Sequence, residues 1–205
     1  NRLADGDEIT LEPMSKFPVV RDLWVDRGRL FFNLERVRAW VPIDGTYVSE
    51  KSENLGNGTF GYREFVFNDD QWELKFTLYF DSLRTKPVFR FRAKGPYSVQ
   101  GASSKVTGAD NALFTFDKKY VTLLSSDAAV ATGFGFTACN LQVNTEKDIT
   151  DSGCSFLVSK SACGQEYDLL KKDGDKLFLG ARPATGDMCA EDRRPTALGA
   201  ALVKR

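Results

Sequence analysis

Apolar and polar residues alternate along much of the chain after Gly45, a pattern typical of strands with one buried face. The clearest run covers 72–80, where every second residue is large and apolar. A similar run at 60–67 precedes it, and the polar stretch 68–71 between the two predicts a β-hairpin. A third run follows at 88–94, with aromatic residues on one face and basic residues on the other.

Shorter apolar runs continue at close spacing toward the end of the chain. A turn is predicted at 94–97, and Asp173-Gly174 is predicted to connect a last hairpin. The proline-containing tail after 180 is predicted to be irregular and to pack along the outside. Because strands do not alternate with helices, the pattern predicts a mainly β fold, either an antiparallel barrel or a strongly bent sandwich. The further strands are predicted at 97–100, 113–116, 120–124, 130–137, 141–143, 156–158, 167–170 and 176–179.

The first 44 residues have a different pattern of apolar and polar positions. Apolar residues from Leu30 to Val41 recur at steps of three and four, which predicts one amphipathic helix. An extended arm is predicted before it, at 14–20. We therefore expect two parts, an arm and helix at 1–44 and an antiparallel barrel at 45–205.

The charge balance and the absence of histidine exclude several classes of function. The 205 residues include 28 basic and 28 acidic side chains, and this balance argues against a nucleic-acid partner. With no histidine in the chain, Ser-His-Asp and Cys-His catalytic units and imidazole metal ligands are excluded. We expect neither a metal nor another cofactor.

The four cysteines all lie in the last third of the chain. Their even number favours two disulfides and a secreted, periplasmic or cell-surface protein, and four buried free thiols are the alternative. No two cysteines have the C-x2-C spacing of a zinc site. Three pairings are open. The residues concerned are Cys139, Cys154, Cys163 and Cys189.

Few polar residues are candidates for catalysis or for binding a charged ligand. The glycine-rich stretch 133–136 lacks the helix and lysine of a phosphate-binding loop, so we interpret its glycines as strand glycines. The basic residues Arg90, Arg92 and Lys94 are interpreted as a solvated outer face. A carboxylate-dependent enzyme ranks third among the functions, because no spacing singles out an acid–base pair. The carboxylates considered are Glu64, Glu73, Asp81 and Glu166.

The aromatic residues point instead to binding. The chain has 16 phenylalanines, and most of them occupy alternating strand positions. A barrel of about eight strands can enclose a small apolar molecule or lipid, while a plain packed core is the alternative. The leading hypothesis is non-enzymatic binding of such a ligand. The candidate ligand-binding residues are Trp72, Phe76, Phe80, Phe89, Phe91, Phe134 and Phe136.

One resemblance concerns residues 1 to about 45. The stretches NRLA, EITLEP, FPVVRDL, VDR and AWVPIDG are similar to the segment between the two cluster domains of the succinate dehydrogenase/fumarate reductase iron–sulfur subunit. The family has a cluster cysteine where this chain has Asp5, and the downstream C-x2-C-x2-C run is missing, so no cluster is expected. The resemblance implies an accessory or assembly subunit, peripheral on a respiratory membrane, that docks through 17–41. The docking residues would be Arg21, Trp24, Arg27, Phe31 and Trp40.

A second resemblance covers 45–205. The stretches GTYVSE, CGQEYDL, LFLG and RPT, in this order and spacing, resemble one domain of the adenomatosis polyposis coli down-regulated 1 family. Animal members are secreted or membrane-tethered Wnt inhibitors with two such domains. The resemblance implies a lipocalin-like antiparallel barrel with an apolar pocket suited to a fatty acyl chain.

Overall fold

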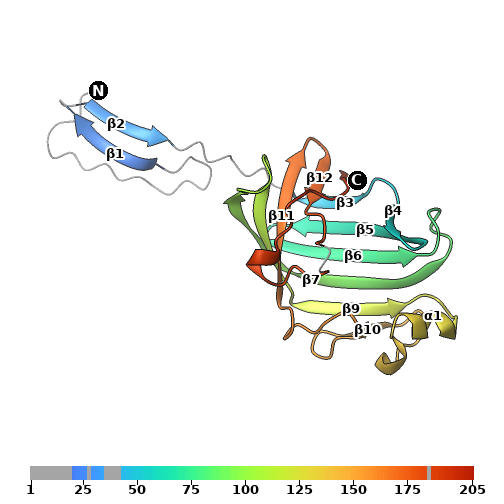
Figure 1. Ribbon diagram of the computed structural model, residues 1–205. Coiled ribbons are helices and arrows are strands. Elements are labelled where there is room, and N and C mark those ends of the chain that lie inside the picture. Colours follow the sequence, from blue (N-terminus) through green and yellow to red (C-terminus); the bar gives the residue numbers. More distant parts are fainter. Residues whose placement is uncertain (1–19, 27–28, 35–42, 184–185) are drawn as a thin grey trace. The chain divides into compact units, whose positions relative to one another are not determined.

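The computed structural model describes residues 20–26, 29–34, 43–183 and 186–205 (Figure 1). The chain forms two compact units, Asn1–Val41 and Pro42–Arg205. Among the described residues, the first unit contains a two-stranded sheet and the second an eleven-stranded sheet.

The sheet of the first unit corrects one prediction. Strand β1 (Val20–Asp26) pairs antiparallel with β2 (Arg29–Leu34), so the predicted amphipathic helix is wrong over 30–34. The apolar run of β2 is short enough to suit a strand as well as a helix, and pairing with β1 satisfies its backbone polar groups. Residues 35–41 of that helix, and most of the arm predicted at 14–20, lie outside the described residues.

Eight strands of the second unit close into an antiparallel barrel, which confirms the predicted fold class (Figure 1). Their order around the barrel is β7-β6-β5-β3-β13-β12-β11-β8, and β8 pairs with β7 to complete the circle. The hairpin predicted at 60–80 is β5 and β6, and the turn predicted at Asp173-Gly174 joins β11 to β12. The barrel strands are β3 (Gly45–Ser49), β5 (Thr59–Asn68), β6 (Gln71–Tyr79), β7 (Pro87–Ala102), β8 (Asp110–Thr115), β11 (Gln165–Asp173), β12 (Lys176–Leu179) and β13 (Leu202–Lys204).

Strand β7 is long enough to serve two parts of the sheet. Its first half pairs with β9 (Lys118–Leu123) and its second half with β8. The turn predicted at 94–97 is wrong, because the strand passes through this point without reversing. Gly95 permits the close approach of the neighbouring chain, since a Cβ atom there would collide with the carbonyl oxygen of Thr115. Besides β9, two strands lie outside the barrel circle: β4 (Glu53–Gly56), which pairs with β5, and β10 (Glu146–Asp148), which pairs with β9.

Residues 124–164, which we call the insert, connect β9 to β11. The strand predicted at 130–137 is wrong, because these residues form α1 (Ala128–Gly133) and the 3₁₀ helix η1 (Thr137–Cys139). The carboxylate of Asp127 caps α1 by accepting a hydrogen bond from the amide of Ala129 at 2.8 Å. The strands predicted at 141–143 and 156–158 are also wrong, since those residues contribute only isolated bridges.

The tail after 180 is irregular where it is described, apart from the 3₁₀ helix η2 (Glu191–Arg193), until it reaches β13. Strand β13 was not predicted from the sequence; it lies between β12 and β3 and completes the barrel. Three residues are too few to show an alternating pattern.

The end of the barrel beside the β5–β6 turn is filled by aromatic rings, which we call the packed end. The ring of Phe67 stands edge-on to Tyr97, with centroids 5.2 Å apart. Trp72 stands edge-on to Phe114 at 5.1 Å, and its indole nitrogen donates a hydrogen bond to the carbonyl oxygen of Thr115 at 3.1 Å. This half of the barrel is therefore a core and not a ligand pocket. The rings of the packed end are Tyr47, Phe65, Phe67, Trp72, Tyr97, Phe114 and Phe116.

Candidate functional site

A second group of aromatic rings gathers at the other end of the barrel, where β6 ends and β7 begins. Phe89 is at its centre, with ring centroids 5.3 Å from Phe136, 5.6 Å from Phe134 and 5.8 Å from Phe156. Strands β6 and β7 and the loop between them supply half of the group, and the insert supplies the rest. We call this group the aromatic rim, and it consists of Phe76, Phe80, Phe89, Phe134, Phe136 and Phe156.

The aromatic rim runs from the core to the surface. Phe89 and Phe136 are buried, while 42% of Phe80 and 55% of Phe156 is exposed. Gly61 of β5 allows the ring of Phe76 to pack closely against the strand, because a Cβ atom there would lie 2.8 Å from this ring. The rim thus presents a continuous apolar surface to any molecule at this end of the barrel.

The inner face of the barrel beside the rim is also accessible to solvent. The strand register places Leu74 and Phe76 of β6, and Phe91 of β7, on the same face as the buried Trp72 and Phe89. All three are partly exposed although they lie on the inner face. The inner face is therefore partly exposed beside the rim, whereas Trp72 at the packed end is buried.

Most of the predicted ligand-binding residues meet at this end. Five of them belong to the rim, and Phe91 packs beside it against the same buried cluster. Trp72 is placed differently, because it belongs to the packed end. Phe156 was not predicted as a ligand-binding residue, because it lies in a loop and has no alternating pattern that could have indicated it.

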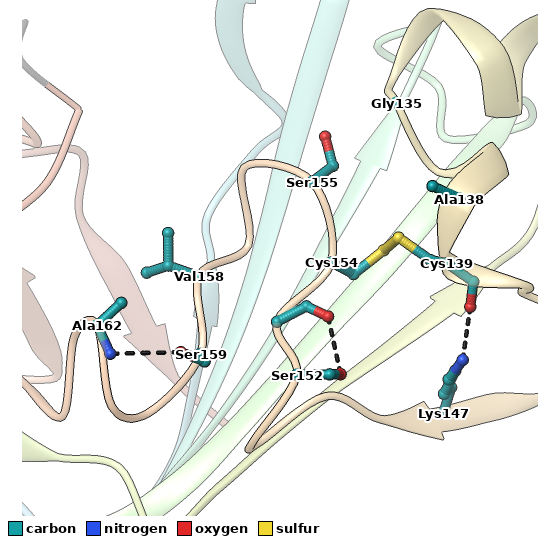
Figure 2. A pocket seen from close by; sticks show the side chains of 11 residues that line it. Gly135, Ala138, Cys139, Lys147, Ser152, Cys154, Ser155, Val158, Ser159 and Ala162 are labelled. Atoms are coloured by element: carbon teal, nitrogen blue, oxygen red, sulfur yellow. Dashed lines mark hydrogen bonds between the residues drawn. A yellow bond between two sulfur atoms is a disulfide. The ribbon is translucent and has the colours of Figure 1, made fainter.

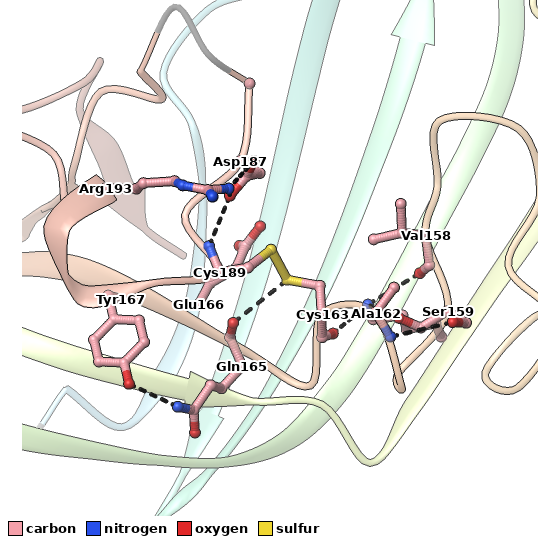
Figure 3. The surroundings of a disulfide bond; sticks show 12 residues. Val158, Ser159, Ala162, Cys163, Gln165, Glu166, Tyr167, Asp187, Cys189 and Arg193 are labelled. Carbon is pink, nitrogen blue, oxygen red and sulfur yellow. Dashed lines mark hydrogen bonds and ion pairs between the residues drawn. A yellow bond between two sulfur atoms is a disulfide. The ribbon is translucent and has the colours of Figure 1, made fainter.

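Both pairs of cysteines form disulfides, which confirms the prediction of paired cysteines and fixes the pairing. Cys139 bonds to Cys154, with Cα atoms 5.7 Å apart. This bond joins η1, directly after Phe136, to the loop that carries Phe156, so it holds together the two parts of the insert that build the rim. Cys163 bonds to Cys189 and fixes the tail beside the start of β11 (Figure 3).

A buried lysine holds the insert from inside the barrel. The ammonium group of Lys119 donates hydrogen bonds to the carbonyl oxygens of Cys163 at 2.7 Å, Val158 at 3.1 Å and Ser159 at 3.4 Å. It also lies 4.2 Å from the ring centroid of Phe116. Burial lowers the pKa of Lys119, and the carboxylate of Glu166 opposes that shift.

A cleft of about 580 Å³ lies beside the first disulfide, on the surface of the insert (Figure 2). Its polar groups already have partners: Lys147 donates to the carbonyl oxygen of Cys139 at 2.5 Å, and the Ser155 hydroxyl donates to Phe134 at 2.9 Å. The Ser152 hydroxyl donates to the carbonyl oxygen of Gly153 at 2.9 Å. Lys147 is the ionisable side chain among the residues that line this cleft, and its ammonium group is engaged by the carbonyl oxygen of Cys139.

A smaller hollow of about 360 Å³ lies away from the rim, beside Trp72, Lys94 and Asp117. Neither this hollow nor the cleft beside the disulfide is lined by a phenylalanine of the rim. The lining of the two hollows therefore does not overlap with the aromatic rim.

Each carboxylate considered for catalysis has a local partner, and Glu64 and Glu73 share the ammonium group of Lys75, at 3.2 Å and 3.8 Å. Glu64 lies 3.2 Å from Lys75, Glu73 lies 3.5 Å from Arg92, and Glu166 lies 2.9 Å from Arg182. Asp81 accepts a hydrogen bond from the Thr85 hydroxyl at 2.7 Å, and this bond, with two backbone amides, lowers its pKa. Each of the four is therefore engaged locally, as is Arg92, which also bonds to Glu146 at 2.6 Å on the outer face.

The most perturbed acid was not among these candidates. Burial raises the pKa of Asp168, on β11, to about 7. Its carboxylate accepts hydrogen bonds from the amides of Leu169 at 2.7 Å and Gly180 at 2.8 Å. Arg194 lies next to it and donates to the carbonyl oxygens of Asp168 and Ala112. The arrangement fastens the tail to the barrel.

In the part of the chain that the structure describes, no group of three or more histidine, cysteine, aspartate or glutamate side chains is arranged to hold a metal ion. No helix within the same ranges has the length and apolar character needed to cross a membrane.

No protein-family model matches the chain. A segment of 39 residues is 67% identical to the succinate dehydrogenase iron–sulfur subunit of Bacillus subtilis (strain 168). The match covers 19% of this chain and 15% of that subunit, so the chain spans only a small part of its curated relative. The likeness supports a partial resemblance to that subunit.

The predicted docking residues fall in the first unit. Trp24 of β1 lies opposite Phe31 of β2 in the register of the two strands, and Arg21 lies at the bulge of β1. Arg27 and Trp40 are outside the described residues.

Proposed function

We propose that the barrel binds an apolar ligand, such as a fatty acyl chain or a lipid, at the aromatic rim and the adjoining inner face. The observation that carries the proposal is the partial exposure of Leu74, Phe76 and Phe91 on the inner face of a closed barrel. A closed barrel normally buries its inner face or reserves it for a ligand. The rim continues that apolar surface outward, as expected of an entrance for an apolar chain.

The arrangement of polar groups supports binding without turnover. The four carboxylates considered for catalysis are held in ion pairs or local hydrogen bonds, and the aromatic rim contains no titratable side chain. The resemblance to the adenomatosis polyposis coli down-regulated 1 family supports an acyl chain as the ligand. Its stretches CGQEYDL and LFLG lie in and around β11 and β12, in the wall of the barrel. The two disulfides are compatible with an extracellular or periplasmic location.

The test is extraction of the purified protein with organic solvent, followed by mass spectrometry, and titration of delipidated protein with a fluorescent fatty acid. Phe76→Asp places a charge on the inner face and is expected to weaken binding at least about tenfold, because the carboxylate must be desolvated. Val143→Asp, at an exposed position outside the rim, is the matched control. Wild-type protein that yields no lipid and shows no saturable binding would refute the proposal.

The 39-residue match favours a second candidate for the first unit. In this proposal the unit docks on a respiratory complex through β1 and β2, with Trp24 and Phe31 as contacts. Comigration of the chain with succinate dehydrogenase on native gels supports it, and loss of comigration in a Trp24→Ala/Phe31→Ala variant is the expected result. A wild-type chain that never comigrates with the complex would refute it.

A further inference from the structure

The loop between β6 and β7 displays an apolar side chain on a rigid support. Asp81 accepts hydrogen bonds from the Thr85 amide at 2.9 Å and from the Lys86 amide at 2.9 Å, and the Phe80 amide bonds to the carbonyl oxygen of Lys86 at 3.0 Å. At the tip of this loop 80% of Leu83 is exposed. Together with Phe80, which is 42% exposed, this leucine gives the loop an exposed apolar surface that another molecule can contact.

Exposed cations surround that leucine. Arg84 and Lys86 are in the same loop, and Lys51 is in the neighbouring β3–β4 turn, which is tied to the loop by a hydrogen bond from Ser52 to the carbonyl oxygen of Ser82 at 2.7 Å. The guanidinium group of Arg84 lies 4.3 Å from the ring centroid of Tyr62, which holds it at the surface. Among the described residues, none of the three cations has an ion-pair partner within 4.0 Å.

The nearby carboxylates are already engaged. Glu53 lies 2.8 Å from Arg63, and Glu50 lies 3.4 Å from Lys176. Asp81 is occupied by the hydrogen bonds of its own loop. The face that remains combines a net positive charge, from three cations and the Asp81 carboxylate, with exposed apolar side chains.

We infer that this face docks on an anionic lipid bilayer, with Leu83 entering the interface and Lys51, Arg84 and Lys86 contacting lipid headgroups. Apolar insertion together with basic residues is the combination that holds proteins at anionic membrane surfaces. Phe80 follows β6 directly into the same loop and also belongs to the rim, so docking brings the rim against the bilayer. The inference rests on the proposed function, for which it names the source of the ligand.

The experiment is flotation of the full chain with vesicles of phosphatidylcholine alone, and of phosphatidylcholine mixed equally with phosphatidylglycerol. Binding is expected for the mixed vesicles, and salt is expected to weaken it. Arg84→Glu/Lys86→Glu should reduce binding by at least about tenfold, and Leu83→Ser should reduce it severalfold. Lys105→Glu, in the β7–β8 loop at the opposite end of β7, and Val143→Ser are the matched controls and should bind like wild type.

Equal binding by wild type, Arg84→Glu/Lys86→Glu and Leu83→Ser, or no binding to mixed vesicles, would overturn the inference. A concentration-dependent dimer that Leu83→Ser abolishes would also overturn it, because a second copy would then cover this face. Lipid extraction separates the two proposals. Ligand recovered from a chain that does not float supports the barrel site alone, and flotation of a chain without ligand supports the docking face alone.

Discussion

The ammonium group of Lys119 and the carbonyl oxygen of Cys163 are joined by a hydrogen bond of 2.7 Å that crosses from the inner face of β9 to the end of the insert. Two further carbonyl oxygens of the insert accept from the same group. One side chain therefore anchors the loop that follows Phe156, and it does so directly beside a disulfide.

Replacement of this lysine is expected to loosen the insert. Lys119→Met keeps the length of the side chain but leaves three carbonyl oxygens without their donor, which should lower the free energy of unfolding by about 2–3 kcal/mol. Urea denaturation measures the change. Lys118→Met is the control, because that lysine forms a half-exposed ion pair with Asp148 and should matter by less than about 1 kcal/mol. Equal losses in the two variants would contradict the anchoring role.

The hydroxyl of Tyr47 is expected to destabilise the barrel. It is fully buried, and no hydrogen-bond partner reaches it among the described residues. Tyr47→Phe removes an unsatisfied polar group at little cost in packing and should raise the free energy of unfolding by about 1 kcal/mol. Tyr167→Phe provides the contrast, since the Tyr167 hydroxyl accepts a hydrogen bond from Gln165 at 2.8 Å and its removal should not stabilise. A melting temperature for Tyr47→Phe below that of wild type would count against this account.

The sequence predicted those parts of the fold in which apolar and polar residues alternate along a strand. The β5–β6 hairpin and the rim residues Phe76 and Phe89 follow from alternation, because every second residue of such a strand faces the interior. A barrel was predicted, but the strands that close it were not, since closure depends on the three residues of β13 and on the passage of β7 through Gly95. Phe156 and Lys119 were missed for a related reason. Their roles arise from contacts between segments far apart in the sequence.

Asp168 predicts a specific dependence of stability on pH. Its pKa in the folded chain is raised to about 7 from the 3.8 of an ordinary aspartate, because the carboxyl group is buried. The folded state therefore binds the proton more tightly than the unfolded state, and this contribution to stability is complete below about pH 4 and is lost as the pH rises to about 7. Among the charged groups around it, Glu166 raises the pKa of Asp168 further and Arg182 lowers it. Arg194 is the third charged group beside the carboxyl group.

Asp168→Asn removes this titration and keeps an oxygen that can accept from the amides of Leu169 and Gly180. Relative to wild type, the variant should gain stability between pH 4 and pH 7, by an amount on the order of a few kcal/mol, and the difference should be constant above pH 7. Chemical denaturation of both proteins across this range measures it. Parallel pH profiles would show that Asp168 titrates normally.

The disulfide between Cys139 and Cys154 should matter for the aromatic rim as well as for stability. It closes a loop with a sequence separation of 15, which in the chain-entropy view stabilises the fold by about 3 kcal/mol. Cys139→Ser/Cys154→Ser should therefore lower the melting temperature. It should also weaken binding of a fluorescent fatty acid, because Phe136 and Phe156 are no longer held at their ring separation of 5.7 Å.

The second disulfide supplies the comparison. Cys163→Ser/Cys189→Ser opens a loop with a sequence separation of 26, so its effect on unfolding should be similar or somewhat larger. Its loss frees the tail, however, and leaves the bond between η1 and the Phe156 loop intact. Binding measured at a temperature where both variants are folded should then be weaker for the first variant only. If both variants lose binding to the same extent, the rim is not the part of the molecule that holds the ligand.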